Sequence, residues 1–250
     1  MNINSDINVL GSILDLGLID FLLKESTILL KGNESQQIYT SIKTIKSFKR
    51  FEKAINNTVI KFNNQNVEVL VRQVLENEGI SFYGLRILFW NASFNNELLN
   101  YLNQQVYFPA LYSGRVTIRS DEVLACLMDL KHTEISMQKL ADSTIQTTAS
   151  KYLTLLKKFN LMEGGAKKTI SHHHMSDKEL ILFVYWILAL EDINNILESR
   201  WLKYCFLEKG IFVQQIMQKK FMKFMNVIFT GDKLKIENNF SYEVIYDELK

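Results

Sequence analysis

The scarcity of helix-breaking residues is the feature that most constrains how this chain folds. Proline occurs once in 250 residues, at Pro109, and glycine occurs ten times. Inside a helix, glycine costs about 1 kcal/mol and proline about 3 kcal/mol relative to alanine, so their rarity favours long helices over many short strands. The hydrophobic content of 47% is sufficient for a sizeable core. The sequence therefore predicts a mainly α, multi-helical protein.

Apolar residues at helical spacing divide the chain into three predicted regions. Helical patterns fill residues 1–115, and turn-forming residues after Pro109 mark the boundary. Residues 116–172 form a predicted winged-helix-like module. Residues 173–250 form a C-terminal helical region, with helix expected over 176–225. A terminal β-hairpin is expected around the turn Thr230-Gly231-Asp232-Lys233, because short apolar runs flank it.

Residues 120–170 carry the most informative pattern. The spacing predicts a helix over 120–130, a short helix over 136–141 and a third helix over 145–159. A predicted hairpin follows, with glycines at its tip (164–165) and a basic second strand. Three helices followed by a hairpin are typical of a winged helix-turn-helix, in which the third helix enters the major groove of DNA. We therefore expect a central winged helix-turn-helix within the helical fold.

The third predicted helix leaves a polar face uncovered, and the hairpin adds two lysines. Between Ser143 and Ile170 the sequence has five lysines and one acid, although the net charge of the whole chain is only +2. Glutamine, serine and threonine can contact base edges, and lysine can contact phosphate. The residues predicted to contact double-stranded DNA are Gln146, Thr147, Ser150, Lys151, Thr154, Lys158, Lys167 and Lys168.

A second group of cations follows one face of the helix predicted at 35–56. Spacings of three and four residues place Lys43, Lys46, Arg50 and Lys53 on a single stripe. Such a stripe is usually a solvated helix face, and an additional contact with DNA or with RNA is the functional alternative. The stripe can contribute to DNA binding only if it lies on the same side of the molecule as the third helix of the module.

The sequence contains no recognisable catalytic or cofactor motif. Residues 164–169 lack the Gly-Lys pair of a phosphate-binding loop and follow a helix instead of preceding one. The side chains of the three successive histidines, 172–174, cannot easily converge on one ion, and no cysteine or acidic cluster nearby completes a metal site. We predict a protein that is not an enzyme and that uses no cofactor, metal or small-molecule substrate.

The sequence also favours a cytoplasmic protein without a membrane anchor. The strongest apolar run, 180–190, has eleven residues, whereas a spanning helix needs about 20. The first residues lack the basic segment of a signal peptide. Cys126 and Cys205 lie in apolar helical patterns, which favours two buried thiols in a reducing compartment over a disulfide.

Several short motifs in the module and upstream of it point to a known family. They are Ser143-Thr144, Ala149, the Leu153–Leu156 apolar pattern, residues 159–165 and 167–170, and, upstream, residues 88–90, 98–109 and 111–114. Together they resemble the BrxA family of bacteriophage-exclusion (BREX) defence systems, most clearly over residues 85–170. Family members tend to carry arginine or lysine directly after the Ser-Thr pair, whereas this chain has Ile145 and Gln146.

The resemblance implies a helical accessory protein with DNA-binding capacity, no known catalysis and a role in antiviral defence and phage resistance. It implies that the protein acts beside other BREX proteins, including a methyltransferase and an ATPase. Pattern and resemblance together predict a non-enzymatic protein that contacts duplex DNA through a winged helix. The alternative is a protein-interaction adaptor within the defence complex that does not bind nucleic acid directly. Exposed apolar surface near Trp186 or Trp201 would favour the adaptor.

Overall fold

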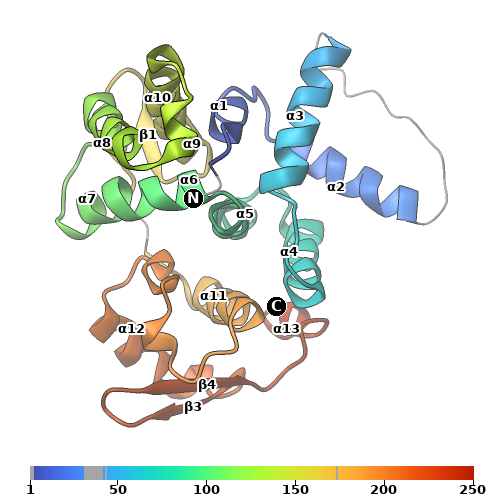
Figure 1. The fold of residues 1–250 in the computed structure, drawn as a ribbon. Helices are drawn as coiled ribbons and strands as arrows, with labels where there is room; N and C mark the ends of the chain where they lie inside the picture. Colours follow the sequence, from blue (N-terminus) through green and yellow to red (C-terminus); the bar gives the residue numbers. More distant parts are fainter. Residues whose placement is uncertain (1–2, 31–41, 43, 173) are drawn as a thin grey trace. The chain divides into compact units, whose positions relative to one another are not determined.

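The protein is mainly helical, with two small antiparallel strand pairs. The computed structural model describes residues 3–30, 42, 44–172 and 174–250 (Figure 1). The chain divides into two compact units, one formed by Met1–Lys61 with Ile80–His172 and the other by Phe62–Gly79 with His173–Lys250. The region predicted as 1–115 therefore contributes to both units. Within the described residues, no helix is both long enough and apolar enough to cross a bilayer.

Unit 1 begins with three helices, α1 (Asp6–Leu10), α2 (Gly17–Leu30) and α3 (Ile45–Thr58). The apolar pattern that starts at residue 7 is not one helix, because residues 11–16 leave helical geometry between α1 and α2. Ile7 of α1 and Ile55 of α3 are fully buried, and the two helices pack together. α1 also packs against α10, so it has a packed neighbour on each of two sides.

A run of four consecutive elements follows in unit 1: α5 (Phe82–Asn95), α6 (Glu97–Leu102), the π-helical turn η1 (Asn103–Tyr107) and α7 (Phe108–Tyr112). Apolar spacing predicts a helix over 95–106 that ends before Phe108-Pro109, but η1 leads directly into α7. Pro109 is the second residue of α7, so the π-helical turn η1 lies directly before it.

The module at 116–172 contains three helices and a hairpin. The helices are α8 (Ser120–Thr133), α9 (Ile135–Gln138) and α10 (Asp142–Lys158), and the strands are β1 (Met162–Gly164) and β2 (Lys168–Ile170). β1 and β2 pair antiparallel with Met162 opposite Ile170. The segment before α8 adds a third strand-like pairing, because Thr117 bridges to Thr169 and the Ile170 N–H donates to the Val116 carbonyl at 2.8 Å.

The starts of two helices in the module differ from the prediction. Ser120 is the N-cap that the sequence favours for α8, but the structure has Arg119 in that position, and the Glu122 carboxylate accepts from the Arg119 N–H at 3.2 Å. α10 begins at Asp142, three residues before the predicted start, because Ala141 takes the extended N-cap conformation. The Lys131 ammonium holds this start by donating to the Asp142 carboxylate at 2.7 Å and to the Leu140 carbonyl at 2.9 Å.

Unit 2 is built around two helices, α4 (Gln65–Glu78) and α11 (Asp177–Leu190). Residues 179–187 of α11 are all buried, and Trp186 stacks edge-on against Trp201 with ring centroids 5.8 Å apart. Helix does not continue to residue 225 as predicted. The chain instead forms the 3₁₀ turns η2 (Ile196–Glu198), η3 (Leu202–Cys205) and η4 (Lys219–Phe221), and one further helix, α12 (Lys209–Ile216).

The end of the chain forms the predicted hairpin. β3 (Met225–Phe229) and β4 (Leu234–Asn238) pair antiparallel, and α13 (Ile245–Glu248) follows them. The Asn195 side-chain oxygen accepts from the Leu197 N–H at 3.3 Å and from the Leu234 N–H at 3.0 Å. This side chain thereby joins η2 to the hairpin.

Candidate nucleic-acid interface

The inner face of α10 is fixed by buried contacts within unit 1. The Tyr152 hydroxyl donates to the Asn103 side-chain oxygen at 2.9 Å, and the Asn103 amide donates to the Ser93 hydroxyl at 3.0 Å. All three residues are fully buried. The rings of Phe159 and Phe89 lie 5.6 Å apart at the end of the helix. These contacts set the rotation of α10 about its axis and so determine which residues face outward.

The outward stripe of α10 contains polar side chains. Gln146, Thr147 and Ser150 are exposed and Thr154 is half-buried. The Thr147 hydroxyl donates to the Ser143 carbonyl at 2.8 Å and the Thr154 hydroxyl to the Ser150 carbonyl at 3.0 Å. Each threonine hydroxyl therefore keeps its lone pairs for an outside donor, whereas an exposed glutamine amide can both donate and accept. We define the outward stripe as Gln146, Thr147, Ser150 and Thr154.

Lys151 and Lys158 lie directly beside the outward stripe, on the edge of α10 that faces α1. Both are half-buried. The Lys158 ammonium donates to the carbonyls of Leu10 and Gly11 at 3.2 and 3.1 Å and also to that of Ile13. Burial, together with the smaller effect of the positive charge of Lys151, lowers the pKa of Lys158 to about 8. Lys158 therefore holds the chain after α1, and its charge is engaged within the protein.

The hairpin that follows α10 brings its two lysines to one rim. Gly164 adopts a φ of +89°, and a Cβ at this position would lie 2.4 Å from the Lys167 carbonyl, so the tight turn requires glycine. The Lys157 ammonium donates to the Gly164 carbonyl at 2.5 Å and ties the end of α10 to β1. Lys167 is exposed and Lys168 half-buried. Among the described residues, no ion pair joins either lysine to an acid.

A groove of 560 Å³ lies between the start of α8, the outward stripe of α10 and the hairpin. The structure brings Ser150, Lys167 and Lys168 together at this groove and adds Arg119, which the sequence did not single out. Its remaining lining residues are Thr117, Ile118, Ser120, Leu153 and Ala166. No acidic side chain is among the described residues that line it. The groove is therefore a cationic depression continuous with the outward stripe through Ser150.

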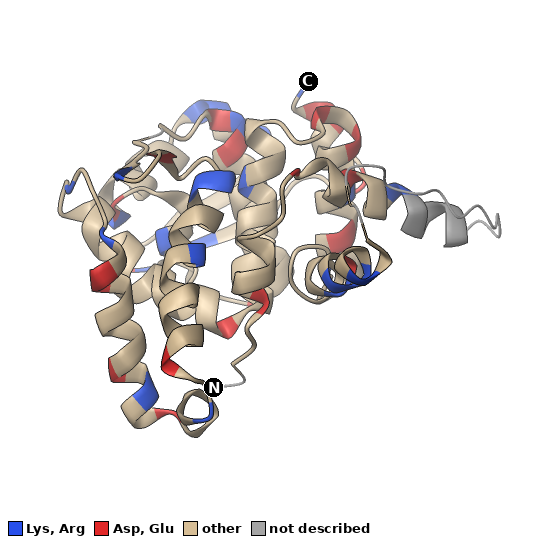
Figure 2. Cartoon of the chain, turned by 90° about the horizontal axis from the view of Figure 1, so that it is seen from above, with Lys and Arg blue, Asp and Glu red and all other residues tan. Residues whose placement is uncertain are grey.

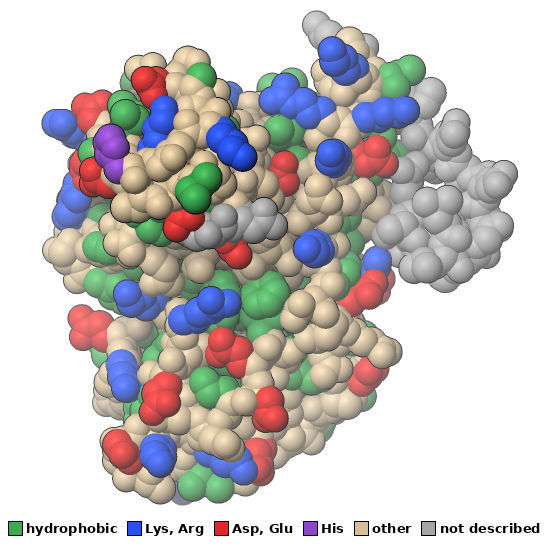
Figure 3. All heavy atoms as spheres, viewed as in Figure 1, with side chains coloured by type: hydrophobic (Ala, Val, Ile, Leu, Met, Phe, Trp, Pro, Cys, Tyr) green, Lys and Arg blue, Asp and Glu red, His purple; other side chains and the backbone are tan. Residues whose placement is uncertain are grey.

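The cationic stripe of α3 is present on the part of the helix that the structure describes. Lys46, Arg50 and Lys53 are exposed, Lys49 is exposed beside them, and Lys43 lies outside the described residues. Lys and Arg gather along α3 in the cartoon of Figure 2, and the same cluster appears in the space-filling view of Figure 3. α1 packs against both α3 and α10, so one short helix separates the stripe from the module.

Two residues of the site are missing from the sequence prediction. Arg119 lies two residues before the acidic pair Asp121-Glu122, so the sequence around it has no excess of positive charge. Lys157 is exposed on α10, and its ammonium holds the hairpin by donating to the Gly164 carbonyl. The sequence shows that Lys157, Lys167 and Lys168 are close together along the chain. Only the fold shows that Arg119 lies at the same groove as Lys167 and Lys168.

The described residues contain no group of three or more His, Cys, Asp and Glu side chains arranged to hold a metal ion. His173 lies outside the described residues. Comparison of the chain with protein-family models, with curated proteins and with solved structures found no match.

Proposed function

We propose that this protein is a non-enzymatic DNA-binding protein that contacts duplex DNA through α10 and the β1–β2 hairpin. The observation that carries the proposal is the outward stripe of α10, a row of polar side chains that meets a cationic groove at Ser150. The order of α8, α9, α10 and hairpin supports a winged helix, in which the N-terminal part of the third helix contacts base edges.

The chemistry of the stripe suits the major groove. The Gln146 side chain can form a bidentate pair with adenine, and the threonine hydroxyls can accept from base amino groups. Phosphate contacts come from Lys167 and Lys168 on the hairpin. Lys151 and Lys158 face α1, so we assign them a smaller share of the DNA contacts than the sequence suggested. The α3 stripe could extend the phosphate contacts along the duplex.

The biological setting rests on the family resemblance of residues 85–170. Those motifs support an accessory role in a BREX-type phage defence system, with duplex DNA and other BREX proteins as partners and a cytoplasmic site of action.

The stripe is tested by comparing two variants in fluorescence anisotropy with labelled duplex DNA at low salt. Gln146→Ala combined with Ser150→Ala should weaken binding to a preferred sequence about 10-fold or more and binding to other duplexes much less, because base contacts carry specificity. Lys209→Ala, an exposed change in α12 of unit 2, is the matched control and should bind as the wild type does. Equal affinities for all three proteins would remove α10 from the DNA-binding face.

An adaptor remains the second candidate because unit 2 exposes apolar side chains. Trp186 and Trp201 are buried, so neither tryptophan contributes to an exposed apolar surface. Ile228 and Phe229 on β3 are 48% and 38% exposed. Loss of phage resistance with Ile228→Lys, at unchanged duplex affinity, would favour the adaptor. Loss of resistance with the Gln146→Ala, Ser150→Ala variant would favour DNA binding.

A further inference from the structure

The groove beside α10 has two kinds of lining, and each matches one part of a nucleic-acid backbone. Its rim carries the positively charged Arg119, Lys167 and Lys168. Its lining also includes Leu153 and Ile118, which are only 4% and 2% exposed. A site for a free inorganic anion needs the charges but not the apolar wall, and 560 Å³ is much larger than one phosphate group. The combination fits a phosphate attached to a sugar whose C–H groups can pack against an apolar wall.

We propose that this groove receives one sugar–phosphate unit of the DNA backbone, with Arg119, Lys167 and Lys168 around the phosphate and the deoxyribose against Leu153 and Ala166. The inference rests on the proposed DNA-binding function and specifies where the strand beside α10 is held.

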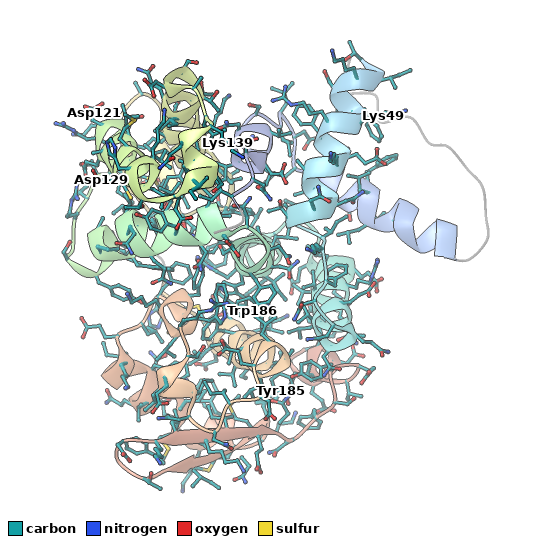
Figure 4. The ribbon with its side chains drawn as sticks, in the orientation of Figure 1. Lys49, Asp121, Asp129, Lys139, Tyr185 and Trp186 are labelled. Atoms are coloured by element: carbon teal, nitrogen blue, oxygen red, sulfur yellow. The ribbon has the colours of Figure 1, made fainter. Side chains whose placement is uncertain are left out.

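Arg119 already forms an ion pair with a carboxylate of its own chain. Its guanidinium lies 3.4 Å from the Asp121 carboxylate, and both side chains are largely exposed. Asp121 is labelled in Figure 4 on α8. An exposed pair of this length is weak, so a phosphate can displace the carboxylate from Arg119. Asp121 therefore competes with the DNA backbone for Arg119 and lowers the affinity of the groove.

This competition gives opposite predictions for two neighbouring changes. Arg119→Gln should weaken binding to every duplex about 3-fold to 10-fold, because a phosphate contact carries no sequence information. Asp121→Asn should strengthen binding to every duplex about 2-fold or more. Asp232→Asn, in the exposed turn between β3 and β4, is the control for removal of a surface carboxylate and should leave the affinity unchanged.

The phosphate itself can be located with duplexes that carry a single neutral methylphosphonate at successive positions. One position should weaken the wild-type protein and have no further effect on Arg119→Gln, because the variant has already lost that contact. The inference is overturned if the wild type binds duplex DNA but both Arg119→Gln and Asp121→Asn bind equally well. In that case the proposed DNA-binding function stands without this groove.

A second measurement distinguishes a groove that binds a free phosphate compound from a groove that binds the DNA backbone. Inorganic phosphate is titrated into the protein while the NMR signals of residues 117–120 and 166–168 are followed. Shifts at these signals without any duplex binding at low salt would show an anion site that serves a free phosphate compound, and would overturn the backbone assignment together with the proposed function.

Discussion

At the scale of single residues, a glycine determines how closely α1 approaches α10. A Cβ at Gly11 would lie 2.6 Å from the Lys151 carbonyl oxygen and 2.9 Å from the Lys151 Cβ, so any side chain must push the two segments apart. The Lys158 ammonium binds carbonyls in the same place. The sequence shows Gly11 only as a helix breaker, because the close approach arises between segments about 140 residues apart.

Gly11→Ala should therefore lower the free energy of unfolding by about 1–3 kcal/mol, which is the usual cost of overpacking. Urea denaturation measures the change. Gly210→Ala in α12 is a matched control, because a Cβ at that position meets nothing within 4 Å. The control should be neutral or slightly stabilising, since alanine favours helix. Equal stabilities for Gly11→Ala and the control would show that α1 and α10 are not in close contact.

The buried Tyr152 hydroxyl gives a second residue-scale prediction. Tyr152→Phe removes the donor to the Asn103 side chain inside unit 1 and should destabilise the protein by about 1–2 kcal/mol. The double variant with Asn103→Leu should cost less than the sum of the two single changes, because the pair shares one bond. Strict additivity in urea denaturation would contradict the contact that sets the rotation of α10.

At the scale of elements, the sequence predicts what local signals determine and misses what distant segments build together. The order of helices and hairpin over 120–170 follows from apolar spacing, from a glycine tip and from acidic residues at a helix start. The groove could not be predicted, because Arg119, Ser150 and Lys167 belong to three elements separated by about 17–31 residues. The sequence predicts Lys158 as a DNA contact for the same reason, since its spacing gives no sign of α1.

The elements of unit 2 are joined by a charged link. The Lys178 ammonium donates to the Glu78 carboxylate at 2.8 Å and to the Tyr246 hydroxyl at 3.1 Å, and this hydroxyl donates to Glu78 at 2.6 Å. The hydrogen bond from Lys178, followed by that from Tyr246, lowers the pKa of Glu78 below its ordinary value of 4.5. One side chain thus connects α4 to both α11 and α13.

Because the folded protein holds Glu78 at a lower pKa than the unfolded chain, the stabilisation is complete above about pH 4.5 and is lost as the pH falls through the folded value. Glu78→Gln should lower the free energy of unfolding by about 1 kcal/mol at pH 7. The difference from the wild type should shrink at pH 3. Glu76→Gln, exposed on the same helix, is the control. A difference that stays constant with pH would contradict the link.

At the scale of the whole molecule, each compact unit combines segments that are far apart in the sequence. Residues 62–79 leave the N-terminal region and join residues 173–250, so α4 supports a unit whose other elements come more than 90 residues later. Apolar spacing marks α4 as a helix, yet nothing in it indicates the partner, because its buried face of Val67, Leu70 and Val71 would suit any core. The module at 116–172, the α3 stripe and the groove all belong to unit 1.

The central claim is that the outward stripe of α10 and the β1–β2 hairpin form one duplex-binding face. The most direct measurement is the salt dependence of duplex affinity, with the wild type beside the double variant Lys167→Gln, Lys168→Gln. Each phosphate contact contributes about −0.9 to the slope of log affinity against log salt. We expect a steep slope for the wild type and one shallower by about 1–2 for the variant. Equal slopes, or no duplex binding by the wild type at low salt, would contradict it.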